Sequence, residues 1–137
     1  MKKSLLLMFV LFIVSTSFSP LIQLNSKTKL IVYYFHLTNR CHTCTSIETT
    51  TVNILNEKFK TELDNEIIVF KSINVDDKAN EVLCKKYEAY GSTLALTKMK
   101  DGKELKTEDL TNMAFSKINK PDLFSSELIG KINEMLK

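Results

Sequence analysis

The chain has 137 residues, the length of one domain with a substantial hydrophobic core. It carries 19 basic and 16 acidic residues, a formal net charge of +3, and Gly and Pro are rare. This composition argues against a turn-rich all-β protein and predicts a compact α/β domain. Read along the sequence, the charges form no basic stripe of the kind that indicates nucleic-acid binding or an anionic membrane surface.

The first 19 residues have the order of a secretory signal peptide. A basic start is followed by the apolar run Ser4–Val14 and by the small polar residues Ser15–Pro20. We expect cleavage near Ser17 or Ser19, which predicts export to a periplasmic or other extracytoplasmic location. An uncleaved N-terminal anchor is the alternative, because no A-x-A-like site is present. The anchor would then be the only contact with a membrane.

The rest of the chain divides into a polar leader, residues 20–29, and one folded domain, residues 30–137. Hydrophobic periodicity within this domain predicts four strands and three helices. The expected strands are residues 30–35, 67–75, 93–99 and 104–107, the last of them polar and at an edge. The expected helices run from Cys44 to Leu63, from the Asp76-Asp77 cap to Tyr87, and from Pro121 to Met135. Residues 110–118 are ambiguous and are compatible with a short further helix. Asp101-Gly102 between two strands predicts a tight hairpin.

Cys41 and Cys44 follow directly after the first expected strand, where a helix begins. Two cysteines at this spacing can close a small disulfide ring with little movement of the backbone. Free N–H groups and the positive end of the helix dipole stabilise a thiolate at Cys41. This thiolate is the expected nucleophile that forms a mixed disulfide, and Cys44 then resolves it. His42 lies between them and, as an imidazolium, would favour the charged sulfur.

The order of elements, with the Cys-x-x-Cys pair after the first strand, resembles the thioredoxin-like superfamily over roughly residues 30–136. The strings Tyr33-Tyr34-Phe35-His36 and Arg40-Cys41-His42-Thr43-Cys44 also resemble the small exported proteins of the nitrophenyl compound nitroreductase subunit ArsF family. The superfamily resemblance implies a β-α-β-α-β-β-α order and a four-stranded mixed sheet flanked by helices. It further implies a substrate groove beside the cysteines, formed by Arg40, Thr43, Ser92 and Thr93.

The sequence departs from the thioredoxin pattern at the groove. Thioredoxins have a cis-proline before the third strand, and Ser92 is the residue nearest to that position here. A cis bond before a non-proline residue costs about 2.5–4 kcal/mol, so we expect a trans peptide and a changed groove. Arg40 replaces the aromatic residue that usually precedes the first cysteine. Its guanidinium either tunes the thiolate or is solvated, and the solvated state is favoured because exposed charges contribute little.

The proton chemistry also departs from that pattern. The buried acid of thioredoxins falls near Tyr34 or Phe35, and neither side chain ionises in the useful range. His36 is the nearest substitute as a proton acceptor, because imidazole titrates near neutral pH. The alternative is a histidine at the strand end that hydrogen-bonds the loop. The third cysteine, Cys84, is expected to be a buried and inert small hydrophobe.

These observations predict an extracytoplasmic thiol–disulfide oxidoreductase or electron carrier without an organic cofactor. Its partners would be a substrate protein and a redox partner protein, bound through mixed disulfides, and not nucleic acid. One alternative is a thioredoxin-fold Cu(I)-type chaperone with Cys41 and Cys44 as ligands and His36 or His42 nearby. Another is a noncatalytic binding domain in which the two cysteines form a permanent disulfide.

Overall fold

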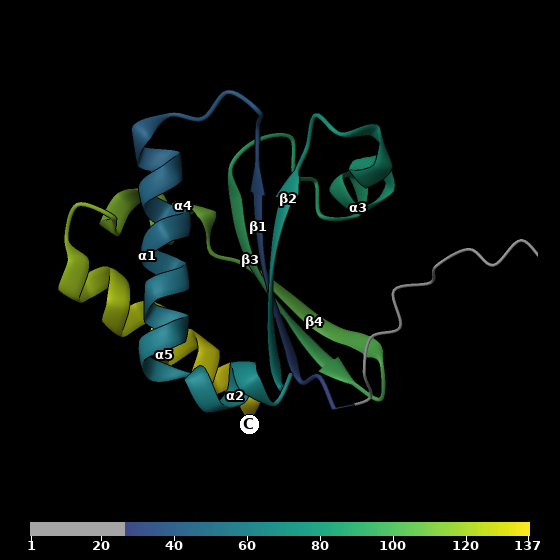
Figure 1. The fold of residues 1–137 in the computed structure, drawn as a ribbon, viewed down its shortest axis with the longest axis vertical. Coiled ribbons are helices and arrows are strands. Elements are labelled where there is room, and N and C mark those ends of the chain that lie inside the picture. Colours follow the sequence, from purple (N-terminus) through teal and green to yellow (C-terminus); the bar gives the residue numbers. More distant parts are fainter. Residues whose placement is uncertain (1–26) are drawn as a thin grey trace, which may run out of the picture.

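The computed structural model describes residues 27–137, and the expected signal peptide and most of the expected leader lie outside the described residues. A four-stranded mixed sheet in the order β2-β1-β3-β4 carries helices on both faces (Figure 1). The strands are β1 (Leu30–His36), β2 (Ile68–Asn74), β3 (Thr93–Lys100) and β4 (Lys103–Asp109). The helices are α1 (His42–Lys58), α2 (Lys60–Asp64), α3 (Glu81–Lys86), α4 (Thr111–Lys117) and α5 (Pro121–Leu136), with a 3-10 turn η1 (Lys78–Asn80) before α3.

The central strand β1 pairs in parallel with β2 and antiparallel with β3, and β4 completes the sheet as the antiparallel partner of β3. This is the thioredoxin-like α/β arrangement that the sequence predicts. Its strand β1 is a continuous β-branched and aromatic run because both of its faces are buried. Alternate side chains enter two cores, one under α1, α4 and α5 and a smaller one under α3 (Figure 1).

Helix α1 begins two residues before the expected Cys44, and it ends before the expected Leu63. The Thr49-Thr50-Thr51 run has poor helix propensity, and burial of one face of α1 compensates for it. At Phe59 the backbone leaves the helical region with φ −130°, and α2 follows in a new direction. Phe59 itself stays buried in the larger core, so the break keeps its ring packed while the chain turns towards β2.

The segment from β2 to β3 differs from the prediction in its helix. The carboxylate of Asp77 caps the 3-10 turn, accepting the Ala79 N–H at 2.9 Å, and α3 is only six residues long. Cys84 is buried against β1, as expected. Val82 on the same helix is apolar, yet 83% of it is exposed, because one short helix can bury only one face.

The predicted features of the C-terminal part are confirmed with small shifts. Asp101 and Gly102 both have positive φ, 50° and 75°, the combination that a two-residue type I′ hairpin requires. Strand β4 is the polar edge strand but reaches Asp109, and the ambiguous segment after it forms α4. Pro121 opens α5, whose apolar stripe is buried except for Leu123, which is 48% exposed.

Candidate functional site

Cys41 and Cys44 form a disulfide at the N-terminus of α1, with their Cα atoms 5.1 Å apart. Cys41 is the N-cap residue, and its Sγ accepts the backbone N–H of Cys44 at 3.1 Å. The sulfur therefore lies where the first turn presents its free N–H groups, the position that stabilises a thiolate after reduction. Cys41 is exposed and Cys44 is half-buried, so an incoming disulfide can reach Cys41 first.

The two residues between the cysteines lie in the first turn of α1, because the helix begins before the expected Cys44. His42 is exposed, and no hydrogen bond to its imidazole occurs within residues 27–137. Thr43 is half-buried beside it. An exposed imidazolium next to Cys41 in sequence can stabilise a thiolate only through a solvent-screened field, which makes His42 a weak tuning group.

Behind the disulfide, Tyr34 joins the central strand to the cysteine turn. Its hydroxyl donates to the carbonyl oxygen of Cys44 at 2.6 Å, and its ring is buried. Burial raises the pKa of Tyr34, while hydrogen bonding with Ser92 and the charge of Arg40 work against that rise. Tyr34 therefore stays protonated as a donor at neutral pH. These interactions also place Ser92 on the disulfide side of the sheet, next to the Tyr34 hydroxyl.

The structure brings only one of the two predicted residues at the start of β3 to the disulfide. No cis peptide occurs within residues 27–137, so the trans peptide expected at Ser92 is confirmed. Thr93 pairs with Phe35 and lines a hollow beside Tyr87, on the opposite face of the sheet. Successive strand residues point to opposite faces, so Ser92 and Thr93 cannot both face the cysteines.

An ion pair that the sequence reading missed lies next to the site. The guanidinium of Arg40 pairs with the Glu48 carboxylate, which also accepts a hydrogen bond from Ser72 on β2. Arg40 also lies over the Tyr34 ring, 5.7 Å from its centroid. The predicted solvated Arg40 is therefore wrong, because its side chain is only 24% exposed and is held by a carboxylate and a ring.

Burial by itself would raise the pKa of Glu48, but the hydrogen bonds from Ser72 and Arg40 and the Arg40 charge outweigh it and hold the pKa below 4.5. Glu48 is thus a carboxylate at neutral pH, and it neutralises the arginine that precedes Cys41. One signal was available in the sequence. Cys44 and Glu48 are four residues apart on α1, which places them on one face of the helix.

The loop that carries the chain from β1 to Cys41 is held by the end of β2. The Thr38 N–H donates to the Asp76 carboxylate at 2.7 Å. This bond and a hydrogen bond from the Thr38 side chain lower the pKa of Asp76. Nδ1 of His36 lies 2.9 Å from the Leu37 carbonyl oxygen, the geometry of a histidine that hydrogen-bonds the loop. The positive field of His36 also contributes to the low pKa of Glu48 and of Asp76. A role for His36 as proton acceptor stays a prediction.

The third cysteine lies apart from the pair. Cys84 packs in the core under α3, on the face of the sheet opposite to α1, and burial raises the pKa of its thiol. Within residues 27–137 no group of three or more His, Cys, Asp or Glu side chains is placed to hold a metal ion. In the same range, no helix has the length and apolar character needed to cross a membrane.

Comparison with known proteins gives likeness only to solved structures. No protein family and no curated protein matches the chain. Among similar structures, thioredoxin-2 of a malaria parasite is 24% identical, covering 70% of this chain and 86% of its own, with TM-score 0.44. The Drosophila melanogaster thioredoxin Deadhead is 27% identical, covering 64% and 80%, with TM-score 0.43. Thioredoxin O2 of Arabidopsis thaliana is 15% identical, covering 71% and 79%, with TM-score 0.41. At these scores, the fold assignment depends on the strand order and pairing described above.

Proposed function

We propose that this protein is a thiol–disulfide oxidoreductase or electron carrier that works through Cys41 and Cys44. One observation carries the proposal: an exposed cysteine caps the first turn of a helix and bonds to a partner cysteine one turn inside. A disulfide whose only role is to stabilise a fold usually joins segments far apart in the sequence, because closing a long loop constrains the unfolded chain most. This bridge spans three residues and constrains little, so exchange explains it better than stability does.

Reduction of a substrate proceeds in two exchanges once the pair is reduced. The Cys41 thiolate attacks one sulfur of the substrate disulfide, forming a mixed disulfide and releasing one substrate thiolate, which takes a proton from water. Cys44 gives its proton to solvent, attacks the Cys41 sulfur, restores the Cys41–Cys44 bond and releases the second thiolate. Two electrons pass from the cysteine pair to the substrate, and the reverse sequence oxidises a substrate dithiol. A redox partner protein then returns Cys41 and Cys44 to their starting state, reducing them with its own dithiol or oxidising them with its own disulfide.

The surrounding residues position this exchange. Tyr34 holds the Cys44 carbonyl, which fixes the turn that contains both sulfurs. The carboxylate of Glu48 takes up the charge of Arg40, so the approach to Cys41 is polar without a free guanidinium. We assign His42 as a weak tuning group and His36 as the candidate proton acceptor. Ser92, in place of the thioredoxin proline, leaves substrate binding to contacts other than those of the thioredoxin groove.

The proposal includes an extracytoplasmic location, supported by the signal-like order of residues 1–19. The resemblance to the nitrophenyl compound nitroreductase subunit ArsF family fits a small exported redox protein. Fractionation of cells that express the full chain, with mass analysis of its N-terminus, tests this part. Recovery from the cytoplasm with residue 1 intact would overturn it.

The reduction potential of the pair is the decisive measurement. The protein carries Cys84→Ala, so that Cys41 and Cys44 supply the only thiols. It is equilibrated in graded glutathione buffers and alkylated, and its free thiols are counted by mass spectrometry. We expect reversible titration of two thiols. A potential of about −120 to −180 mV marks an oxidant or isomerase, and one near about −270 mV marks a reductant. A bridge that stays closed below about −300 mV would contradict the proposal and favour a structural disulfide.

A further inference from the structure

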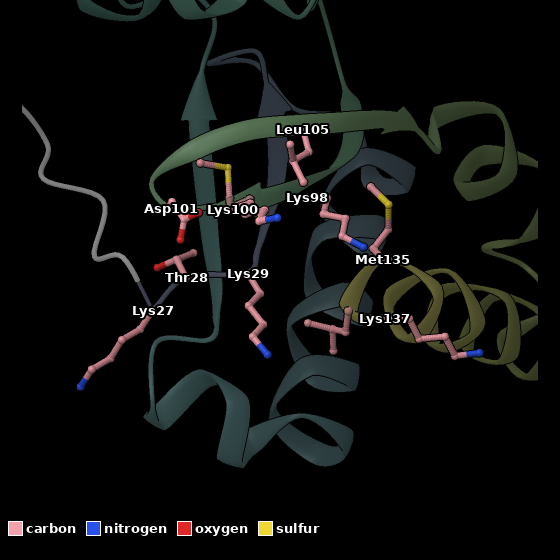
Figure 2. Close-up of a pocket in the computed structure, with 11 residues that line it drawn as sticks. Lys27, Thr28, Lys29, Lys98, Lys100, Asp101, Leu105, Met135 and Lys137 are labelled. Atoms are coloured by element: carbon pink, nitrogen blue, oxygen red, sulfur yellow. The ribbon is translucent and has the colours of Figure 1, made fainter.

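A hollow of about 280 Å³ (Figure 2) lies beside the start of β1, and the disulfide lies beyond the other end of that strand. The segment just before β1, the end of β3 with its hairpin, the edge strand β4 and the end of α5 contribute its walls. Five lysines line it, and we call this surface the lysine pocket: Lys27, Lys29, Lys98, Lys100 and Lys137. Strand β1 runs from this pocket to the cysteine loop, so its seven residues separate the two sites by roughly 20 Å.

Strand pairing creates this concentration of charge. The Met99 N–H donates to the Lys29 carbonyl at 2.7 Å, which brings Lys29, just before β1, beside the lysines of β3 although about 70 residues separate them. Asp101 is the one acidic side chain among the described residues that line the pocket. Lys29, Lys98 and Lys100 form no salt bridge with any residue in the range 27–137. Their charge is therefore available to an outside partner.

The lysine pocket also has an apolar component. Leu105 on β4 is 57% exposed and Leu136 at the end of α5 is half-buried in the wall, whereas Met135 beneath them is buried. Lysine side chains have apolar stems below their charged heads, so together with these residues they make an amphipathic surface. An exposed leucine at the edge of a hollow lined by lysines suits a partner that is anionic at its surface and apolar beneath it.

In the uncleaved chain, the connection to the N-terminal run favours placing this end towards such a partner. Residues 1–26 join the described domain at Lys27, in the pocket wall, and the apolar run Ser4–Val14 ends 13 residues earlier. Thirteen extended residues span at most about 45 Å. If that run enters a bilayer, the tether keeps the domain within this distance of the headgroups. The lysine pocket can then face them while the disulfide points away.

We propose that the lysine pocket docks on the anionic headgroups of a phospholipid bilayer. The proposal goes beyond disulfide exchange and does not depend on it. A small free anion would be held by enclosed donors, whereas these lysines surround an open hollow that has an exposed leucine at its edge. A duplex nucleic acid would meet a long basic stripe, but here the lysines gather at one end of the sheet. A bilayer matches both the charge and the exposed apolar side chain.

Co-sedimentation of the full chain with vesicles tests the proposal. One set of vesicles contains phosphatidylglycerol in phosphatidylcholine, and the other is pure phosphatidylcholine, which measures binding through the apolar N-terminal run alone. We expect stronger partition to the anionic vesicles, reduced by salt. The variant K29Q/K98Q/K100Q should lose on the order of 100-fold of that partition, at about fivefold per lysine. The matched control K78Q/K85Q/K120Q removes the same charge elsewhere and should keep it.

Several results would overturn the proposal. They are equal binding of the wild-type chain to both vesicles, equal losses in the two triple variants, and release by inorganic phosphate beyond that by chloride at equal ionic strength. Displacement from the vesicles by a duplex oligonucleotide would assign the surface to nucleic acid instead. Circular dichroism establishes that both variants fold, and the salt dependence of the wild-type chain gives a test that needs no variant.

Discussion

The two ends of the sheet carry charge in opposite ways. At the disulfide end, Arg40 is bound by Glu48 and stacks over Tyr34, so its charge is used inside the molecule. At the other end, Lys29 and Lys98 have no salt bridge within the described chain and surround a hollow (Figure 2). Internally satisfied charge positions a chemical group, and charge left to solvent attracts a partner from outside. Substitutions at the disulfide end should therefore reduce exchange activity or stability, whereas substitutions at the lysine end should reduce binding to an outside partner.

The largest expected difference concerns the cysteines. Cys41→Ser should reduce disulfide exchange to the uncatalysed rate, because a hydroxyl is not a thiolate nucleophile. Cys84→Ala should keep full exchange activity, since Cys84 lies in the core on the other face of the sheet. Reduction of a small disulfide, followed by absorbance, measures both variants. Equal losses would show that Cys84 belongs to the redox site.

Glu48→Gln tests whether the charge at the disulfide end is held internally. We expect a loss of about 1–3 kcal/mol in the free energy of unfolding, because Arg40 would remain half-buried without a counter-charge. Glu57→Gln removes an exposed carboxylate from the same helix and should cost less than about 0.5 kcal/mol. Urea denaturation gives both values. Similar values for the two variants would show that the ion pair contributes nothing.

The same carboxylate predicts a dependence of stability on acid. The folded pKa of Glu48 lies below its ordinary value of 4.5, so the unfolded chain binds more protons as the pH falls through that region. Its contribution is fully present above pH 4.5 and is lost as the pH falls through the lower folded value. Urea titrations from neutral to acid pH should show a smaller loss in Glu48→Gln than in the wild type. Parallel curves would contradict this.

Tyr34→Phe should have a smaller effect of about 1 kcal/mol on the free energy of unfolding, because the Cys44 carbonyl loses its buried donor. The hydrogen bond also fixes the cysteine turn, so the reduction potential of the pair should shift measurably. Tyr90→Phe changes a residue that is 75% exposed and should alter neither quantity. An unchanged potential in Tyr34→Phe would show that the hydroxyl has no part in holding the turn.

The smallest effect on the domain itself should come from the lysine end. K29Q/K98Q/K100Q should change the free energy of unfolding by less than about 0.5 kcal/mol and leave disulfide exchange unchanged, because these charges have no salt-bridge partner in residues 27–137. Thermal unfolding and the exchange assay measure this. A loss comparable with that of Glu48→Gln would mean that the lysines stabilise the fold, and the contrast between the ends would disappear.

Features of the fold that depend on residues close together in the sequence could be predicted, and features that depend on distant parts of the chain could not. The buried strand β1 and the hairpin at Asp101-Gly102 are encoded by residues within a few positions of one another, and both were predicted. The end of α1 at Phe59 and the exposure of Val82 were not, because each depends on how much of one face the rest of the chain can cover. Periodicity identifies a helix more readily than it locates the end of its buried face.

For the functional site, the sequence by itself determined the chemistry: a Cys-x-x-Cys pair at a helix N-terminus after a buried strand, with a third, buried cysteine elsewhere. Only the tertiary structure decided what surrounds that pair. It joined Arg40, Glu48 and Ser72 from a loop, a helix and a strand, and it collected lysines from both ends of the chain around one hollow. The physical reason is that a thiolate is stabilised by the adjacent helix turn, whereas ion pairs and surface fields depend on distances in space that strand pairing sets.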